Sequence, residues 1–161
     1  MNNIETTYKE NYPKLFRLAT KMVHDETVVD DIVQEVFVYY FEKTQSGHKI
    51  NNPSGWLARA TMNKCVDYLR DKEKFTQLNN VNEPMMEEKP FEINKTEVIL
   101  KQAISKLKPV EMQIVILYSE EYSYKEISQI VKINFSSVGK TLSRTLQKLK
   151  EILKKMNYEM Y

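Results

Sequence analysis

The sequence predicts an all-α protein of two small helical domains, residues 1–74 and 94–161, joined by a flexible linker at residues 75–93. Glycine and proline are few, at 3 and 5 among 161 residues, and the apolar residues recur three or four positions apart, as they do on one face of a helix. Residues 71–94 hold three basic and six acidic side chains, whereas residues 95–161 hold twelve basic and seven acidic ones. This change in charge favours two modules with a linker between them.

The composition argues against an enzyme. One cysteine and two histidines that are far apart in the sequence predict neither a disulfide framework nor a metal site. There is no nucleophile–base set and no glycine-rich phosphate loop, so we expect no catalytic residue and no cofactor. The chain opens without a signal-peptide pattern and has no apolar run of membrane-spanning length, which together predict a cytoplasmic protein.

Two amphipathic helices are expected first, at residues 4–23 and 26–44, the second capped by Asp25 or Thr27. The predicted core face of the second helix consists of Val29, Ile32, Val33, Val36, Phe37 and Tyr40. Its other face carries Asp31, Gln34 and Glu35, which are spaced so that they project together. Such an acidic face is usually only solvated, and binding of a partner is the alternative.

Residues 45–54 have the composition of a loop, and Asn52 with Pro53 supplies a cap and a first-turn proline for a helix at residues 54–74. The apolar side of this helix holds Leu57, Ala58, Met62, Cys65, Val66 and Leu69, and its polar sides present Arg59, Asn63, Asp67 and Arg70. The stretch from Phe75 to Ile93 is polar, acidic and aperiodic. It predicts a linker with no fold of its own.

The C-terminal domain is expected to contain four helices, beginning at about Asn94. Pro109 opens the second helix, and Ser123 and Glu126 form a capping box in front of the third. The third helix is expected to run to about Lys132 and to be followed by a short break at Ile133-Asn134-Phe135-Ser136. The apolar stripe of the fourth helix then consists of Val138, Leu142, Leu146, Leu149 and Leu153. Two helices across so short a turn predict a helix-turn-helix, whose second helix fits a DNA major groove.

The charge of the last helix favours DNA binding. From Lys132 to Lys155 there are seven basic residues and one acidic residue, Glu151. Hydroxyl and cationic side chains, which bond phosphates and base edges, lie off the apolar stripe at Ser136, Ser137, Lys140, Thr141 and Arg144. A solvated helix with a lysine-rich end is the alternative, because the helix dipole favours cations there. The capped partner helix and the tight turn make DNA binding the better interpretation.

Taken in order, these motifs resemble those of extracytoplasmic-function sigma factors, a compact group of the sigma-70 family of bacterial RNA polymerase. The resemblance to region 2 of the family rests on Asp30-Asp31-Ile32-Val33-Gln34-Glu35-Val36-Phe37, on Gly55-Trp56-Leu57-Ala58-Arg59, and on Asn63 with Asp67-Tyr68-Leu69-Arg70. The resemblance to region 4 rests on Leu107-x-Pro109, residues 115–117, Tyr124-x-Glu126-Ile127, and Val138 with Leu142 and Arg144. The resemblance covers most of the chain and leaves out only the linker and the two chain ends.

The resemblance implies a promoter-specificity subunit, responsive to stress or envelope signals, that binds core RNA polymerase and promoter DNA and has no small-molecule substrate. Asp31, Gln34 and Glu35 would bind the clamp helices of the polymerase. The minus-ten element would be opened, with one base flipped out, by Arg59, Asn63, Asp67, Arg70, Lys49, Asn51 and Asn52. The minus-thirty-five duplex would be read by Ser136, Ser137, Lys140, Thr141, Arg144 and Lys148.

The resemblance further implies an anti-sigma factor, often membrane-anchored, that holds the protein inactive, and association with the nucleoid when the protein is active. Without polymerase, the two domains would bind DNA only weakly. Two residues depart from the family pattern: Gly139 stands where a helix former or a cation is usual, and Thr141 stands where an arginine is common. Recognition of the minus-thirty-five element is therefore expected to differ from that of relatives.

Two readings from other classes remain. A dimeric helix-turn-helix regulator would bind a palindrome without polymerase, but it would leave the Asp31, Gln34 and Glu35 face and residues 45–74 without a role. A pure adaptor that sequesters another protein would have no use for the basic helix.

Overall fold

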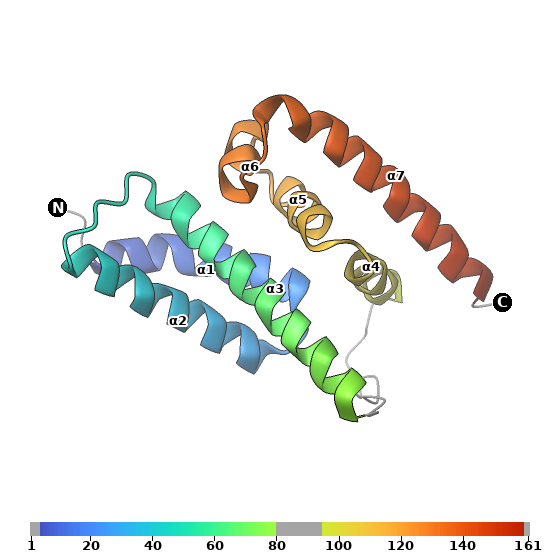
Figure 1. Cartoon of the computed structure of the whole chain (residues 1–161), viewed down its shortest axis with the longest axis horizontal. Helices are drawn as coiled ribbons and strands as arrows, with labels where there is room; N and C mark the ends of the chain where they lie inside the picture. Colours follow the sequence, from blue (N-terminus) through green and yellow to red (C-terminus); the bar gives the residue numbers. More distant parts are fainter. Residues whose placement is uncertain (1–3, 80–94, 160–161) are drawn as a thin grey trace.

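The computed structural model describes residues 4–79 and 95–159, and within these ranges every regular element is a helix. The seven helices described are α1 (Ile4–Met22), α2 (Glu26–Gln45), α3 (Pro53–Asn79), α4 (Lys95–Ser105), α5 (Pro109–Ser119), α6 (Tyr124–Val131) and α7 (Phe135–Glu159). Figure 1 shows them in two groups, α1–α3 and α4–α7. The predicted all-α architecture of two helical domains is confirmed. None of the described helices combines the length and the apolar character needed to cross a membrane.

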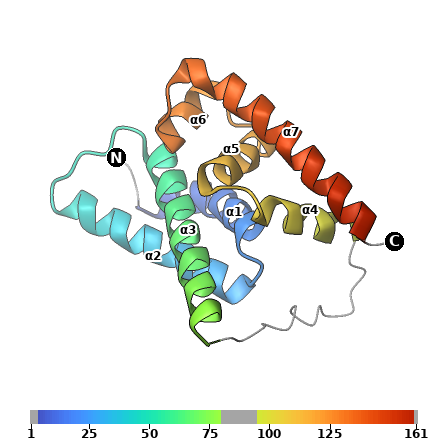
Figure 2. The same ribbon diagram turned by 45° about the vertical axis from the view of Figure 1, so that its right-hand side comes forward.

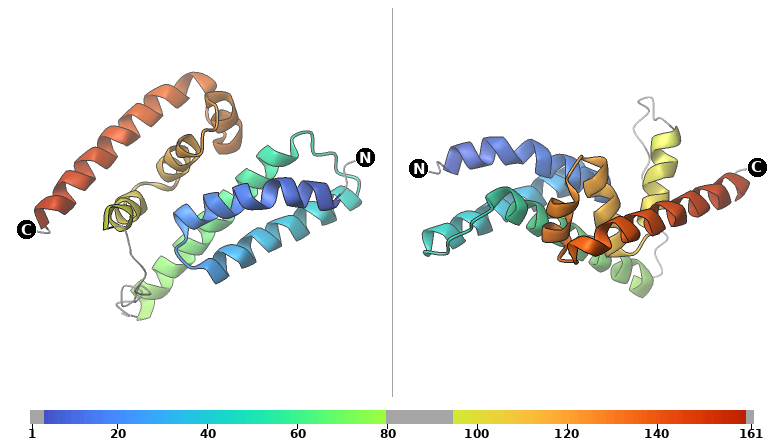
Figure 3. Two further views of the ribbon diagram at one scale, coloured as in Figure 1. Left: turned by 180° about the vertical axis from the view of Figure 1, so that it is seen from behind. Right: turned by 90° about the horizontal axis from the view of Figure 1, so that it is seen from above.

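The N-terminal group is a three-helix bundle in which each helix packs against the other two, as Figure 3 shows from behind and from above. All six residues predicted for the core face of α2 are buried. The cap of α2 is Asp25, whose Oδ1 accepts hydrogen bonds from the backbone N–H groups of Thr27 at 3.0 Å and Val28 at 3.3 Å. The prediction of a cap at this position is therefore confirmed for Asp25, whereas Thr27 lies inside the helix.

Helix α3 begins as the sequence predicted and ends later. Asn52 caps it, since its Oδ1 accepts from the Gly55 N–H at 3.1 Å. A Cβ on Gly55 would lie 2.6 Å from the Asn52 Nδ2, so glycine leaves the space that this cap needs. The predicted end at residue 74 is wrong, because Phe75–Asn79 contains no proline or glycine and continues the helix to Asn79. The rest of the predicted linker, from residue 80 on, lies outside the described residues.

The C-terminal group is built around α5, which is buried at every position from Met112 to Leu117. Helices α6 and α7 pack on α5 and on each other, and α4 packs on α7. Glu111 links two of these helices, because its Oε1 accepts from the Lys108 N–H at 3.0 Å and from the Lys148 Nζ of α7 at 2.9 Å. Burial is the largest single effect on the Glu111 carboxyl and raises its pKa, but the hydrogen bonds from the Lys148 side chain and the Lys108 backbone, together with the charges of both lysines, outweigh it and lower the pKa.

The predicted capping box and helix-turn-helix are both present. The Ser123 Oγ accepts from the Glu126 N–H at 3.1 Å, and the Glu126 Oε1 accepts from the Ser123 N–H at 3.1 Å. Helix α6 ends at Val131, and its C-cap residue Lys132 has φ 59°, in the left-handed region, which turns the chain sharply. Helix α7 then starts at Phe135, so only three residues separate the two helices.

Replacing Ser123 by alanine removes the acceptor of the first capping hydrogen bond. We expect this change to lower the free energy of unfolding by about 1 kcal/mol, the usual cost of losing such a cap. Urea unfolding followed by circular dichroism at 222 nm measures it. Ser123→Thr keeps a hydroxyl at the cap and should change stability much less; equal losses in the two variants would contradict a role for the side-chain oxygen.

The two groups are in contact with each other. Helix α1 contacts α4 and α5, and α3 contacts α6. Figure 2 shows α6 beside the first turns of α3, and α4 near the end of α1. The described parts of the chain therefore form one packed body.

Candidate functional site

The acidic face of α2 is exposed, and neighbouring helices hold two of its side chains in place. Asp31, Gln34 and Glu35 are all exposed. The Gln34 Nε2 donates to the Tyr8 hydroxyl of α1 at 2.8 Å, and the Lys64 Nζ of α3 donates to the Glu35 Oε2 at 3.0 Å. The three side chains predicted to act together therefore do lie on one surface.

This face lines a groove that also contains apolar side chains. The groove is lined by Asp31, Gln34, Glu35, Val38, Tyr39, Glu42 and Lys64. Val38 is 56% exposed and Tyr39 is 47% exposed, so two large apolar side chains lie beside the acidic face. Our sequence analysis missed both. Their position four residues after Gln34 and Glu35 on the same helix is the signal that could have found them.

The polar side of α3 is only partly open to solvent. Asn63, Asp67 and Arg70 are exposed. Arg59 is half-buried, and its Nη1 donates to the backbone carbonyl of Ile130 in α6 at 2.8 Å. The Asn63 Oδ1 lies 3.5 Å from the side-chain nitrogen of Gln113 in α5. Two of the four predicted residues therefore face the C-terminal group, whereas no hydrogen bond or ion pair joins Asp67 or Arg70 to the described part of that group.

The loop before α3 contains three residues predicted to contact the minus-ten element, and their side chains differ in exposure and in bonding. Lys49 and Asn51 are exposed, whereas the side chain of Asn52 is engaged as the cap of α3. Trp56, in the first turn of α3, packs against the rings of Tyr39 and Tyr40 with centroids 5.7 and 5.6 Å away. This aromatic cluster fixes the base of the loop relative to α2.

The residues of α7 predicted to contact the minus-thirty-five DNA form two sets, an exposed line and a flank. Ser136, Lys140 and Arg144 are exposed at successive four-residue intervals, so they form one line along the helix. The flank, which is half-buried, consists of Ser137, Thr141 and Lys148. Within the flank, Lys148 forms the ion pair with Glu111 that ties α7 to α5.

Gly139 lies inside α7 without interrupting it. A Cβ at this position would meet the Tyr124 ring at 3.6 Å, an ordinary van der Waals distance. The fold itself therefore does not require glycine here.

No metal site was found in the part of the chain that the structure describes. Among those residues, no group of three or more histidine, cysteine, aspartate and glutamate side chains could hold a metal ion. Cys65 is buried, and burial raises the pKa of its thiol to about 12, so the thiol is not ionised at neutral pH.

Two family models match the chain in the order of its two helical groups. The model of Sigma-70 region 2 matches residues 7–75, and the model of Sigma-70, region 4 matches residues 97–149. The first match covers nearly all of α1–α3, and the second covers α4–α6 together with the first half of α7.

Relatives match over nearly the whole chain. RNA polymerase sigma factor YlaC of Bacillus subtilis (strain 168) is 26% identical, with 98% of this chain and 96% of that protein covered. ECF RNA polymerase sigma factor SigM of the same strain is 22% identical, with 92% and 94% covered. Among solved structures, the sigma factor RpoE in complex with the anti-sigma factor NepR from Bartonella quintana has the same fold, with a TM-score of 0.72, 19% identity, and 96% of this chain and 98% of that chain covered. With both characteristic regions present in order, the chain belongs to the sigma-70 family as an extracytoplasmic-function sigma factor.

Proposed function

We propose that this promoter-specificity subunit binds core RNA polymerase through the groove on α2, opens the minus-ten element with α3 and its preceding loop, and reads the minus-thirty-five element with α7. The observation that carries the proposal is the division of one chain into two chemically different surfaces. The N-terminal group presents an acidic and apolar groove, and the C-terminal group presents an exposed hydroxyl and cationic line. Core polymerase and DNA require such different surfaces.

The groove on α2 suits a basic, amphipathic helix. Asp31 and Glu35 supply negative charge, and Gln34 supplies an amide that can both donate and accept. Val38 and Tyr39 supply apolar area beside them. Interfaces of this kind gain on-rate and orientation from the charges, and gain affinity from the apolar contacts. The clamp helices of the polymerase are the partner that we assign to this groove.

The minus-ten element is assigned to α3 and to the loop at residues 46–52. Extruding a base costs a few kcal/mol, which must be offset by contacts with the flipped base and with phosphates. Asn63 can bond base edges, Arg59, Arg70 and Lys49 can bond phosphates, and Asn51 stands at the loop surface. Asp67 can accept from an exocyclic amine, while Asn52 would act mainly through its capping of α3.

Replacing Asn63 by alanine tests the minus-ten assignment. Permanganate reactivity of unpaired thymines measures the open promoter fraction, which we expect to fall about tenfold, the effect of one lost base contact of about 1.4 kcal/mol. Binding of closed promoter duplex should change less than twofold. Gln77→Ala, which also removes an exposed amide from α3, is the control. Equal losses of binding and opening would contradict the assignment.

The minus-thirty-five element is assigned to the exposed line of α7. Ser136, Lys140 and Arg144 would contact bases and phosphates, and the flank of Ser137, Thr141 and Lys148 would lie against the edge of the groove. The dimeric regulator is not favoured, because a region 2 match over residues 7–75 assigns the N-terminal group to a sigma factor and not to a sensing domain.

We propose an anti-sigma factor as a further partner. RpoE, which shares the fold of this chain, is bound to the anti-sigma factor NepR in its crystal structure. A partner of the same class would keep this protein from core polymerase until it is released.

Run-off transcription tests the proposed function as a whole. Genomic fragments are transcribed by purified core polymerase with and without this protein, and new defined start sites should appear only in its presence. Alignment upstream of those starts would give both promoter elements. No starts, together with binding of the protein alone to a palindromic DNA, would contradict the proposal and favour the regulator.

A further inference from the structure

The first residue of α7 is a phenylalanine that the core of the protein does not use. Phe135 is 61% exposed, whereas Val138 and Leu142 on the same helix are buried. Its ring takes part in none of the aromatic contacts within the described residues, and it is not among the half-buried side chains that pack against the core. The sequence predicted a break at Phe135, but the structure begins α7 there.

The location of Phe135 points to a role, because a single exposed ring is in itself ordinary on a protein surface. In a helix-turn-helix, the N-terminal residues of the second helix contact base edges in the major groove. Phe135 directly precedes Ser136, with which the exposed line of Ser136, Lys140 and Arg144 begins. Because the Cα–Cβ bonds of a helix tilt toward its N-terminus, the ring extends toward the end of α7 that would enter the groove.

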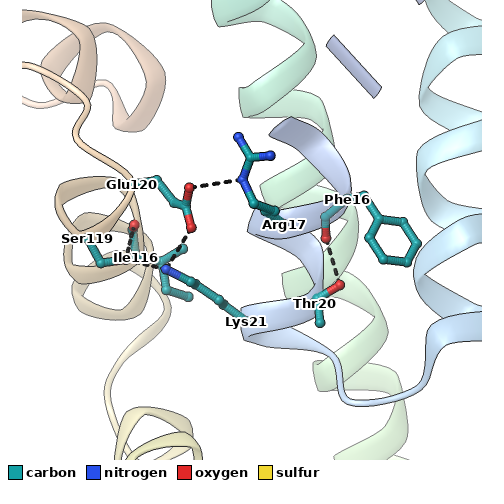
Figure 4. Close-up of polar contacts among 7 residues, drawn as sticks. All are labelled: Phe16, Arg17, Thr20, Lys21, Ile116, Ser119 and Glu120. Carbon is teal, nitrogen blue, oxygen red and sulfur yellow. Dashed lines mark hydrogen bonds and ion pairs between the residues drawn. The ribbon is translucent and has the colours of Figure 1, made fainter. Parts of the chain in front are cut away.

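The contacts between the two helical groups are made by other elements. The carboxylate oxygens of Glu120, the C-cap of α5, lie 2.7 Å from the Lys21 Nζ and 3.3 Å from the Arg17 Nε of α1 (Figure 4). Helix α3 contacts α6. Phe135 takes part in neither of these contacts, and Phe135 and Ser136 are both exposed. The first turn of α7 is therefore open to a ligand.

Gly139 lies one turn after Phe135 on the same side of α7. The fold does not require glycine there, since a Cβ would meet the Tyr124 ring at an ordinary 3.6 Å. A position without a side chain lets a ligand approach the helix backbone closely. DNA can therefore come close to this side of α7, which brings base edges within reach of the Phe135 ring. Because Gly139 offers no side chain, Phe135 is the group through which this side would contact a base.

The chemistry of the ring selects one group in the groove. Phenylalanine cannot form the hydrogen bonds that phosphates and polar base edges offer. The major groove presents one apolar group, the C5-methyl of thymine, with which phenylalanine makes apolar contact. We propose that Phe135 recognises a thymine methyl in the minus-thirty-five element and is thereby a specificity-determining residue of α7. This inference rests on the proposed function, in which α7 enters the major groove of that duplex.

The methyl contact can be separated from every other contact of α7. Thymine and uracil differ only in the C5-methyl, and their hydrogen-bonding edges are the same. Hydrogen bonds from Ser136, Lys140 or Arg144 to bases and phosphates should therefore not distinguish the two bases. Burial of one methyl group is expected to tighten binding about fourfold.

Replacement of thymine by uracil in the duplex tests the contact. The probe is a promoter duplex that run-off transcription identifies, in which each thymine of the minus-thirty-five element, on either strand, is changed in turn to deoxyuridine. Competition binding by the reconstituted polymerase at fixed salt should show a loss of about fourfold at one position for the wild type. Phe135→Ala should weaken binding of the thymine duplex by a similar factor and lose nothing further with uracil.

Two variants serve as controls. Phe75→Ala removes a phenylalanine of similar exposure, 59%, from α3, and it should retain the full uracil effect. Phe135→Leu keeps an apolar side chain and should retain a uracil effect at the same position. Urea unfolding of Phe135→Ala should match that of the wild type, since the ring is exposed, so a loss of binding would not come from a loss of fold.

Three results would overturn the proposal: equal uracil losses in the wild type and in Phe135→Ala, no uracil effect at any thymine, or an element in which no thymine is required. A loss for Phe135→Ala that is the same on every duplex, together with weaker binding of core polymerase, would also overturn it and assign the ring to a protein contact. Failure of the proposed function gives a different result, because no start sites would then appear in run-off transcription. Start sites without any uracil effect contradict only the contact of Phe135.

Discussion

Replacing Gln34 and Glu35 together by alanine is expected to lower the affinity of this protein for core RNA polymerase about 30-fold to 100-fold, or roughly 2–3 kcal/mol, as for a central pair of interface residues. Both side chains line the α2 groove and are oriented in the free protein by hydrogen bonds with Tyr8 and Lys64. Preorganised groups lose little conformational entropy on binding, so their removal costs more than the removal of mobile surface charges. Titration of labelled protein with core polymerase, followed by anisotropy, measures the change.

The same variant should keep its fold. The pair between Glu35 and Lys64 is exposed, with side chains 64% and 46% accessible, and pairs of this kind contribute at most about 1 kcal/mol. Glu73→Ala with Gln77→Ala is a matched control, because it removes an exposed carboxylate and an exposed amide from α3, away from the groove. Equal affinity of the test variant, the control and the wild type would remove the α2 face from the mechanism.

Local features were predictable from the sequence because each is fixed by a few neighbouring residues. The core face of α2 follows from helical spacing alone, and the capping box of Ser123 and Glu126 needs only two residues three positions apart. The end of α3 was mispredicted for a related reason. The polar and acidic composition from Phe75 onward predicts a linker, but Thr76 and Asn79 continue the helix, and their side chains donate to backbone carbonyls one turn back.

Features that depend on distant residues were not predictable. Arg17 and Glu120 lie 103 positions apart, and no local pattern marks them as partners. The same packing takes Arg59 to the carbonyl of Ile130, although the sequence predicted Arg59 correctly as a polar position of α3. In the candidate site, the spacing of Ser136, Lys140 and Arg144 was sufficient to place them on one exposed line, because all three belong to a single helix.

Replacing Arg144 by alanine is expected to weaken binding of the minus-thirty-five duplex by about 1–3 kcal/mol, which corresponds to a loss of roughly 5-fold to 150-fold. Arg144 is exposed on α7, and its guanidinium can bond two acceptors of one guanine in the major groove. The measurement is competition binding of a promoter duplex by the reconstituted polymerase at fixed salt, with point variants of the minus-thirty-five element. Loss of a base contact should relax specificity at one base pair as well as lower affinity.

Two further variants separate a base contact from a general effect of charge. Arg144→Lys keeps the positive charge but not the planar fork, so it should lose most of the discrimination while retaining much of the binding to unrelated duplex. Lys154→Ala removes a charge from the exposed far part of α7 and should weaken all sequences alike, with a shallower dependence on salt. If Arg144→Ala behaved as Lys154→Ala does, Arg144 would contribute only to the positive potential of α7. Base recognition would then fall to Ser136, Lys140 and the flank that contains Thr141.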